Sequence, residues 1–213
     1  MGRRHIITID GPAGAGKSSV ARALARRLGF RYLDTGAMYR ALTWFALERG
    51  TPLDDALALE ALACDYAVEF GDDGCVLIAG HDVTSKIREP VIDASVPVVA
   101  RHPEVRKVMR ERQRALSEQG DSVIEGRDIG VVVAPHADVK VWLVADRAVR
   151  VQRRHAERDG IDAGVLAGEL QRRDERDAQN TLRAPDAIEI DTTHLTLDQV
   201  IDRIESLVRE RVA

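Results

Sequence analysis

A glycine-rich turn between an apolar strand pattern and an amphipathic helix pattern constrains this chain more than any other feature. The segment Ile6 to Gly29 reads IITIDGPAGAGKSSVARALARRLG, and its centre has the spacing G-x-x-x-x-G-K-S from Gly11 to Ser18. Backbone N–H groups bind phosphate oxygens only where the chain curls tightly around them, and such curling requires glycine at the closest approaches. The turn therefore predicts a phosphate-binding loop between a strand and a helix.

The residues after the glycines predict a helix whose N-terminus points at bound phosphates. Apolar residues recur every four positions from Val20 to Leu28, and Gly29 then supplies a helix stop. We expect Lys17 to bridge the β- and γ-phosphates of a nucleotide and the Ser18 hydroxyl to bind a Mg²⁺ ion that keeps several waters. The expected nucleotide-binding residues are Gly11, Pro12, Ala13, Gly14, Ala15, Gly16, Lys17, Ser18 and Ser19.

The composition fits one domain and argues against several kinds of partner. A chain of 213 residues with 45% hydrophobic content buries one sizeable core, with room for inserts but not for two full domains. The formal net charge of −4 argues against a general nucleic-acid or membrane-surface binder. Cys64 and Cys75 fit neither a disulfide framework nor a zinc site, and no apolar run has the length of a membrane span. We therefore expect a cytoplasmic protein with no nucleic-acid or membrane partner.

Strand and helix patterns alternate along most of the chain, which predicts an α/β fold. Such alternation indicates βαβ units, and hence a five-stranded parallel sheet flanked by helices, of the type found in P-loop nucleotide-binding proteins. Over about residues 54–97 the pattern changes to apolar–polar alternation on both sides of Gly71-Asp72-Asp73-Gly74, which predicts a small antiparallel insert. Thr196 and Gln199 form a capping box at the start of the last helix. The predicted strands are Ile6 to Ile9, Arg31 to Leu33, Val123 to Glu125, Val139 to Val144, and Ala187 to Ile190.

Two stretches at predicted strand ends suggest a second anion site. In LDTGAMYR, Thr35 can cap the next helix, Gly36 leaves space for a ligand, and Arg40 can bind an anion. The same residues also fit an ordinary capped helix with a solvated arginine. In IEGRDIG, Arg127 can bind a phosphate and Asp128 can accept a hydrogen bond from an exocyclic amine, at the sheet edge where open α/β proteins bind ligands. A buried Arg-Asp pair of this kind also fits a structural ion pair, which is the alternative to ligand binding here.

Arginines gather in three further helical segments. Arg106 lies in a charge-rich helix from Glu104 to Arg114, and most such helices are simply solvated. In RRDERD, Arg173 and Asp177 share a helical face and can form an i,i+4 pair. Together with a preceding basic helix and a glycine-containing turn, this segment resembles a helical lid over about residues 150–173 that closes on phosphates and excludes water. The arginines of the basic helix are Arg150, Arg153 and Arg154.

These stretches, taken with the phosphate loop, resemble the bacterial cytidylate kinase family of nucleoside monophosphate kinases. The order GPAGAGKS, DTGAMYR, EGRDIG, RRDERD carries the resemblance, which runs through nearly the whole chain and includes the insert. The resemblance implies a monomer that transfers the γ-phosphoryl group of ATP to the small-molecule substrates CMP or dCMP with Mg²⁺. The attacking phosphate oxygen needs no catalytic base, because the second pKa of a phosphate monoester is about 6.

The resemblance also implies individual roles. The acceptor phosphate would be held by Thr35, Arg40 and Arg127. The cytosine edge would be read by Asp128 and Arg106, and the pentose hydroxyls would be approached by Arg173 and Asp177. The transferring phosphoryl group would be surrounded by the catalytic residues Lys17, Arg150, Arg153 and Arg154. Two positions depart from the family pattern, since Pro97 replaces a serine that often assists base recognition and Asn180 replaces an arginine that helps to bind the acceptor phosphate.

Two other classes of protein remain as alternatives. Another small-molecule kinase on the same scaffold would act on AMP, UMP, dTMP or shikimate, and the insert and the GRDIG stretch argue against it. A nucleotide-binding regulator that hydrolyses ATP slowly or not at all would not need a second anion site or an arginine-rich lid. A GTPase is disfavoured because the guanine-reading N/T-K-x-D element is missing.

Overall fold

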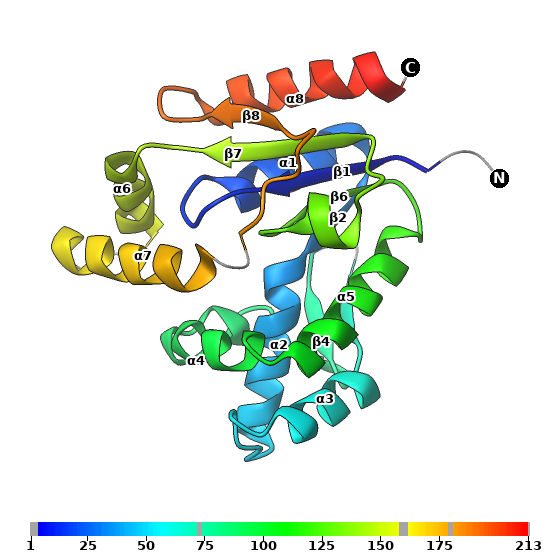
Figure 1. Ribbon diagram of the computed structural model, residues 1–213, viewed down its shortest axis with the longest axis vertical. Coiled ribbons are helices and arrows are strands. Elements are labelled where there is room, and N and C mark those ends of the chain that lie inside the picture. Colours follow the sequence, from blue (N-terminus) through cyan, green and yellow to red (C-terminus); the bar gives the residue numbers. More distant parts are fainter. Residues whose placement is uncertain (1–3, 72–73, 158–161, 179–180, 213) are drawn as a thin grey trace. The chain divides into compact units, whose positions relative to one another are not determined.

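The computed structural model describes residues 4–71, 74–157, 162–178 and 181–212 and divides the chain into two compact units (Figure 1). The first unit comprises Met1–Tyr32 and Gly120–Ala213, and the second comprises Leu33–Gln119. Each unit buries an apolar cluster of its own. The insert expected over residues 54–97 lies inside the second unit.

The first unit is built on a five-stranded sheet with the strand order β2-β6-β1-β7-β8. Each of the observed pairings β1–β6, β1–β7 and β7–β8 is parallel, which confirms the predicted sheet. Every strand lies within one residue of its expected position. The strands are β1 (Ile6–Asp10), β2 (Arg31–Asp34), β6 (Ser122–Glu125), β7 (Val139–Val144) and β8 (Ile188–Asp191).

Two amphipathic helices, α1 (Lys17–Leu28) and α8 (Leu197–Val212), cover one face of this sheet. Their apolar residues pack on Ile7, Ile9 and Val141. Because side chains alternate along a strand, Thr8 and Lys140 point to the opposite face, where the π-helical turn η2 (Ile129–Val133) contacts β1. The predicted capping box of α8 is confirmed by reciprocal bonds, from the Thr196 N–H to Gln199 Oε1 (2.9 Å) and from the Gln199 N–H to Thr196 Oγ1 (3.3 Å).

Two further helices of the first unit, α6 (Arg147–Glu157) and α7 (Ala163–Asp177), lie side by side (Figure 1). The Asp162 side chain caps α7 by accepting hydrogen bonds from the N–H groups of Gly164 (2.8 Å) and Val165 (3.2 Å). Residues 158–161, which fall in the expected lid turn, lie outside the described residues.

The second unit packs helices around a small antiparallel sheet. The sheet has the order β3-β4-β5, which confirms the predicted insert, although Asp72 and Asp73 of the expected turn lie outside the described residues. The elements are α2 (Thr35–Glu48), α3 (Ala56–Asp65), β3 (Val68–Phe70), β4 (Val76–Ile78), β5 (His81–Asp82), η1 (Lys86–Arg88), α4 (Pro90–Ala100) and α5 (Pro103–Ser117). Across the described parts of both units, every helix is too short or too polar to cross a membrane.

Candidate active site

The loop between β1 and α1 has the backbone that the glycine spacing predicts. Gly11, Gly14 and Gly16 all have positive φ, at 145°, 75° and 90°. A Cβ atom on Gly11 would lie 2.2 Å from the Leu143 carbonyl oxygen, so no other residue fits there without a backbone shift. Helix α1 begins at Lys17, directly after the last of these glycines. The loop backbone and a helix N-terminus thus meet at one place, as anion binding requires.

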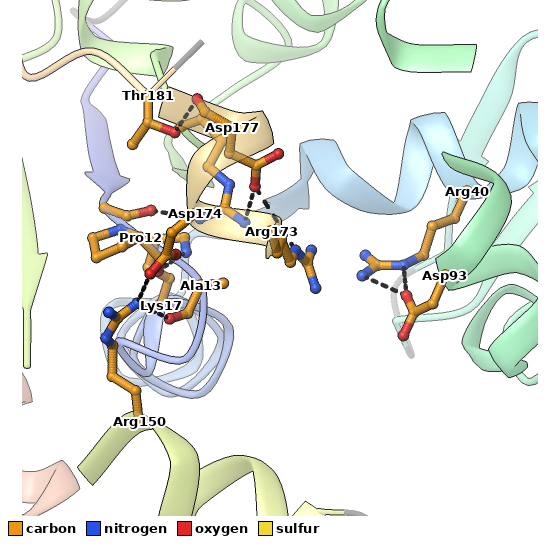
Figure 2. A network of polar contacts seen from close by, with 12 residues as sticks. Pro12, Ala13, Lys17, Arg40, Asp93, Arg150, Arg173, Asp174, Asp177 and Thr181 are labelled. Atoms are coloured by element: carbon orange, nitrogen blue, oxygen red, sulfur yellow. Dashed lines mark hydrogen bonds and ion pairs between the residues drawn. The ribbon is translucent and has the colours of Figure 1, made fainter. Parts of the chain in front are cut away.

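The Lys17 side chain folds back over this loop. Its Nζ donates a hydrogen bond to the Pro12 carbonyl oxygen at 2.8 Å (Figure 2). Burial, and next the positive charge of Arg127, lowers the pKa of the Lys17 ammonium to about 7, while Glu125 opposes the shift. The ammonium is therefore poised to gain stability from an anion that comes to the loop.

Ser18 contacts a carboxylate that the sequence patterns did not single out. The Ser18 Oγ donates to Glu125 Oε2 at 2.8 Å, and the Tyr32 hydroxyl donates to the other carboxylate oxygen. Glu125 is the last residue of β6 and is buried. A hydroxyl and a carboxylate side by side are the hard oxygen ligands that Mg²⁺ takes, so these residues fit the expected ion. Among the described residues no group of three or more His, Cys, Asp or Glu side chains is arranged to hold a metal.

The IEGRDIG stretch lies beside the phosphate loop. Arg127 donates from Nη1 to the Gly11 carbonyl oxygen at 2.9 Å and from Nη2 to Asp177 Oδ2 at 2.8 Å. Asp128 is buried, with 9% of its surface exposed. Asp10, a second carboxylate that the sequence patterns did not single out, accepts hydrogen bonds from the N–H groups of Ile129 (3.0 Å) and Gly130 (2.8 Å).

The three arginines of α6 differ in their surroundings. Arg150 donates from Nη1 both to the Ala13 carbonyl oxygen (2.9 Å) and to Asp174 Oδ2 (2.8 Å), as Figure 2 shows. Arg153 donates to the hydroxyl (2.9 Å) and the carbonyl oxygen (2.7 Å) of Thr192, and also to the Ala15 carbonyl oxygen of the loop at 3.5 Å. Arg154 is half-buried. The structure therefore brings both Arg150 and Arg153 to the backbone of the phosphate loop, and ties Arg153 also to Thr192, the residue that follows β8.

The RRDERD segment lines a pocket in the first unit. Arg173 and Asp177 form the expected i,i+4 pair, with Arg173 Nε 3.7 Å from Asp177 Oδ2 (Figure 2). The same Asp177 oxygen also pairs with Arg127. A pocket of about 290 Å³ lies here and is lined by Pro12, Arg127, Asp174, Asp177, Ala178 and Thr181. Asn180, one of the two departures from the family pattern, lies outside the described residues.

In the second unit, the LDTGAMYR stretch forms the strand end and helix start that the sequence predicts, with one correction. The cap of α2 is Asp34 and not Thr35, since Asp34 Oδ1 accepts from the Ala37 N–H at 2.9 Å. Asp34 keeps an extended backbone (φ −88°, ψ 95°), whereas Thr35 is already the first helical residue, and a cap must lie just outside the helix.

Arg40 pairs with a carboxylate inside the second unit. Its Nε and Nη2 lie 3.2 and 3.1 Å from Asp93 Oδ1 (Figure 2). A Cβ atom on Gly36 would lie 3.2 Å from Arg40 Nη1, so the glycine makes room for this guanidinium. Arg106 of α5 donates to the Ala100 carbonyl oxygen at 3.5 Å. Pro97, the other departure from the family pattern, is inside α4.

Comparison with known proteins points to one family. A family model described as cytidylate kinase matches residues 7–210. The cytidylate kinase of Geobacillus sp. (strain WCH70) is 46% identical over 217 residues, a match that covers 97% of this chain and 97% of that protein. The cytidylate kinase of Geobacillus kaustophilus (strain HTA426) is 46% identical over 223 residues and is covered completely, as is this chain. A solved gluconokinase from Sinorhizobium meliloti 1021 shares only the fold, with a TM-score of 0.51 at 17% identity over 98% of this chain and 95% of that one.

Proposed function

The chain belongs to the cytidylate kinase family, and from that premise we propose that it transfers the γ-phosphoryl group of ATP to CMP or dCMP, giving ADP and CDP or dCDP. One observation of the structure carries the proposal at the level of the site. Arg127 and Arg150, from segments far apart in the sequence, both donate to carbonyl oxygens of the phosphate loop. A protein that only bound a nucleotide would not need two arginines held at its phosphate loop.

The proposed reaction asks the protein for alignment and charge rather than for a base. The attacking oxygen belongs to the acceptor phosphate, whose second pKa is about 6, so it is largely deprotonated at neutral pH. Catalysis then consists of bringing two phosphates into line and neutralising the charge on the transferring group. Lys17 and the arginines of α6 would supply that charge, with Arg150 supported by its bond to the loop.

We propose Mg²⁺ as the required metal, held through Ser18 with Glu125 orienting its bound waters. The 2.8 Å bond between Ser18 Oγ and Glu125 supports this pairing. When bound, the ion would neutralise phosphate charge at the transferring group. The protein's own part is to hold the hydroxyl and the carboxylate in register at the start of α1.

For the acceptor nucleotide we keep the roles that the family resemblance implies. Thr35, Arg40 and Arg127 bind the phosphate, Asp128 and Arg106 read the base, and Arg173 and Asp177 contact the pentose. The burial of Asp128 supports base reading, because a buried carboxylate accepts from the cytosine amine and repels the carbonyl that uracil carries there. The pocket beside Asp177 supports a role for the RRDERD segment in ligand binding.

We further propose that α6 and α7, over about residues 150–173, act as a lid, and that the protein is a cytoplasmic monomer with one functional domain. The Arg150–Asp174 bond supports the lid, since it joins the two helices beside the phosphate loop. Lid closure would exclude water and so suppress wasteful hydrolysis of ATP. The net charge of −4 supports nucleotides rather than nucleic acid as the ligands.

The experiment that tests this function measures ADP formation from ATP and Mg²⁺ with CMP, dCMP, UMP, AMP and shikimate as separate acceptors. We expect CMP and dCMP to be the preferred acceptors. Preference for another acceptor would identify a different kinase, and ADP formation that no acceptor stimulates would identify a regulator.

A Lys17→Ala variant tests the assignment of the donor site. It should abolish transfer while CMP binding stays largely intact, and the exposed Lys107→Ala is the matched control that should leave both unchanged. Loss of CMP binding in Lys17→Ala would show that the donor and acceptor sites are misassigned.

A further inference from the structure

Two segments of the first unit that are more than 100 residues apart are joined by hydrogen bonds in both directions. The Asp10 carboxylate accepts one bond on each oxygen, from the backbone N–H groups of Ile129 (3.0 Å) and Gly130 (2.8 Å). In return, the Arg127 side chain donates to the backbone carbonyl oxygen of Gly11 at 2.9 Å. We call this set, Asp10, Gly11, Arg127, Ile129 and Gly130, the reciprocal clasp.

The clasp connects the phosphate loop, which would bind the donor, to Arg127 and Asp128, which would bind the acceptor. Asp10 ends β1 and is followed at once by the phosphate loop, while Ile129 and Gly130 follow Arg127 and Asp128 at once. Residue 128 therefore sits between two anchored points, the Arg127 side chain and the N–H groups of the next two residues. Such anchoring at both ends fixes the direction of a side chain better than burial alone.

The buried carboxylate of the clasp lowers the stability of the folded protein at neutral pH. Asp10 is 3% exposed, and burial raises the pKa of its carboxyl to about 6, with the nearby charge of Asp128 adding to the shift and Lys17 opposing it. Keeping the carboxylate ionised at neutral pH thus costs the folded protein stability. Groups with that cost are found more often at functional sites than elsewhere.

The turn held by Asp10 also packs closely against the side chains of β1 and β7 at Gly130. A Cβ atom on Gly130 would lie 3.0 Å from Thr8 Oγ1 and 3.3 Å from Lys140 Cδ. A methyl group at position 130 would therefore fit only if these side chains, or the start of η2, shifted by a few tenths of an ångström. Asp10 holds the turn, and Gly130 lets it approach.

We propose that Asp10 is a positioning residue for acceptor recognition, which sets the direction of Arg127 and Asp128 with respect to the phosphate loop. The proposal rests on the proposed kinase function. It assigns Asp10 no contact with either nucleotide. Its effect reaches the acceptor only through the backbone of residues 129 and 130.

The test is steady-state kinetics of Asp10→Asn with ATP varied at fixed CMP and with CMP varied at fixed ATP. Each Asp10 oxygen accepts one of the two N–H bonds, so in Asp10→Asn the side-chain NH₂ group would face one of these N–H groups and lose that bond. We expect KM for CMP to rise about tenfold or more, as small misplacements of a binding group typically cause. KM for ATP should change less than threefold, and the preference for CMP over UMP should fall.

Asp138→Asn is the matched control. Asp138 also accepts a backbone N–H bond on its carboxylate, from Ile6 at 3.0 Å, but it does so at the opposite end of β1. A merely structural role of Asp10 would make both variants less stable and leave both KM values alike. Equal changes in KM for ATP and CMP in Asp10→Asn, or an effect on CMP no larger than that of Asp138→Asn, would overturn the proposal.

Gly130→Ala separates geometry from charge. It crowds the same turn against the side chains of β1 and β7 but keeps the Asp10 charge, which also acts on Lys17. We expect it to reproduce the selective rise in KM for CMP, so it also serves if Asp10→Asn does not fold. An unchanged KM for CMP in Gly130→Ala would count against the proposal. If the unmodified protein does not phosphorylate CMP at all, the proposed function fails, and that result is distinct from a failure of the clasp.

Discussion

Lys17 is the residue whose protonation should respond most to a bound nucleotide. Burial lowers its pKa to about 7, below the ordinary value of 10.5, so at pH 8 the side chain in the free protein is mostly neutral. A phosphate beside it favours the charged form and raises the pKa again. Binding of ATP with Mg²⁺ at pH 8 should therefore take up protons, to a limit of about one per site.

Titration calorimetry in two buffers with different ionisation enthalpies measures this uptake directly. The observed binding enthalpy should depend on the buffer for the unmodified protein and much less for Lys17→Met. The uptake should shrink towards pH 6, where Lys17 is already charged in the free protein. A buffer-independent enthalpy at pH 8, or an equal dependence in Lys17→Met, would contradict the lowered pKa.

Asp128 should decide between cytosine and uracil. Asp128→Ala leaves the cytosine amine without its acceptor, and an unpaired buried polar group costs about 1–3 kcal/mol. The ratio kcat/KM for CMP should fall roughly tenfold to a hundredfold, and that for UMP much less. Asp128→Asn is the matched variant, because its amide can donate to the uracil carbonyl and should improve UMP relative to CMP. Equal losses on both acceptors would remove Asp128 from base reading.

At this scale the sequence predicted the residues whose constraint is local. The phosphate loop was predictable because three glycines, a lysine and a serine at fixed spacing dictate one backbone path. Glu125 and Asp10 were not predicted, because their partners Ser18 and Ile129 lie 107 and 119 positions away in the chain. A buried carboxylate looks like any other acidic residue until the strands are paired.

The strand–loop–helix element of residues 6–28 tolerates change very unevenly. Gly11→Ala would place a Cβ 2.2 Å from the backbone oxygen of Leu143, an atom that cannot move without disturbing β7. Overpacking typically costs 1–3 kcal/mol, and we expect a loss of about 3 kcal/mol or more here because backbone is the obstacle. Denaturant unfolding measures that loss.

Gly29→Ala is the control at the other end of the same element. Gly29 also has positive φ, at 70°, but a Cβ there meets nothing within 4 Å. The cost should be only that of the left-handed backbone, about 1–2 kcal/mol. Similar losses in the two variants would mean that positive φ alone, and not the contact with β7, requires glycine at position 11.

Element boundaries were predictable where a local rule sets them and less so elsewhere. The capping box of Thr196 and Gln199 and the stop at Gly29 are local, and the structure contains both. The cap of α2 was assigned to Thr35 although Asp34 performs it, because both residues are good caps and only the backbone path distinguishes them. Proline usually ends or kinks a helix, but Pro97 lies inside α4, which continues to Ala100. The local signal therefore does not set the end of this helix.

For the molecule as a whole, donor binding should appear as stability. A ligand present at 100 times its Kd adds about 2.7 kcal/mol to the folded state. For a chain of this length that corresponds to a rise of about 5–10 °C in the Tm of the transition in which the first unit unfolds. Scanning calorimetry with and without ATP and Mg²⁺ measures the shift, and Lys17→Ala should lose most of it. An unshifted transition in the unmodified protein at saturating ATP would contradict the assigned loop.

The alternation of strands and helices predicted a parallel sheet but not its strand order. Sequence order and spatial order differ, since β1 lies between β6 and β7 while β2 lies next to β6. The division into two units was likewise not visible, because the second unit has helices on both sides of its small sheet in the chain and no linker composition marks its ends.

The chain leaves and re-enters the first unit at neighbouring points. It departs after Tyr32 and returns at Gly120, and the Arg31 N–H bonds to the Asp121 carbonyl oxygen at 2.9 Å. The 87 residues from 33 to 119 are thus an insertion into the first unit whose two ends are adjacent. Such an arrangement makes them a cassette, which recombination between relatives could exchange through joins within the edge strand β2 and just before β6, while β1 and the donor loop stay uncut.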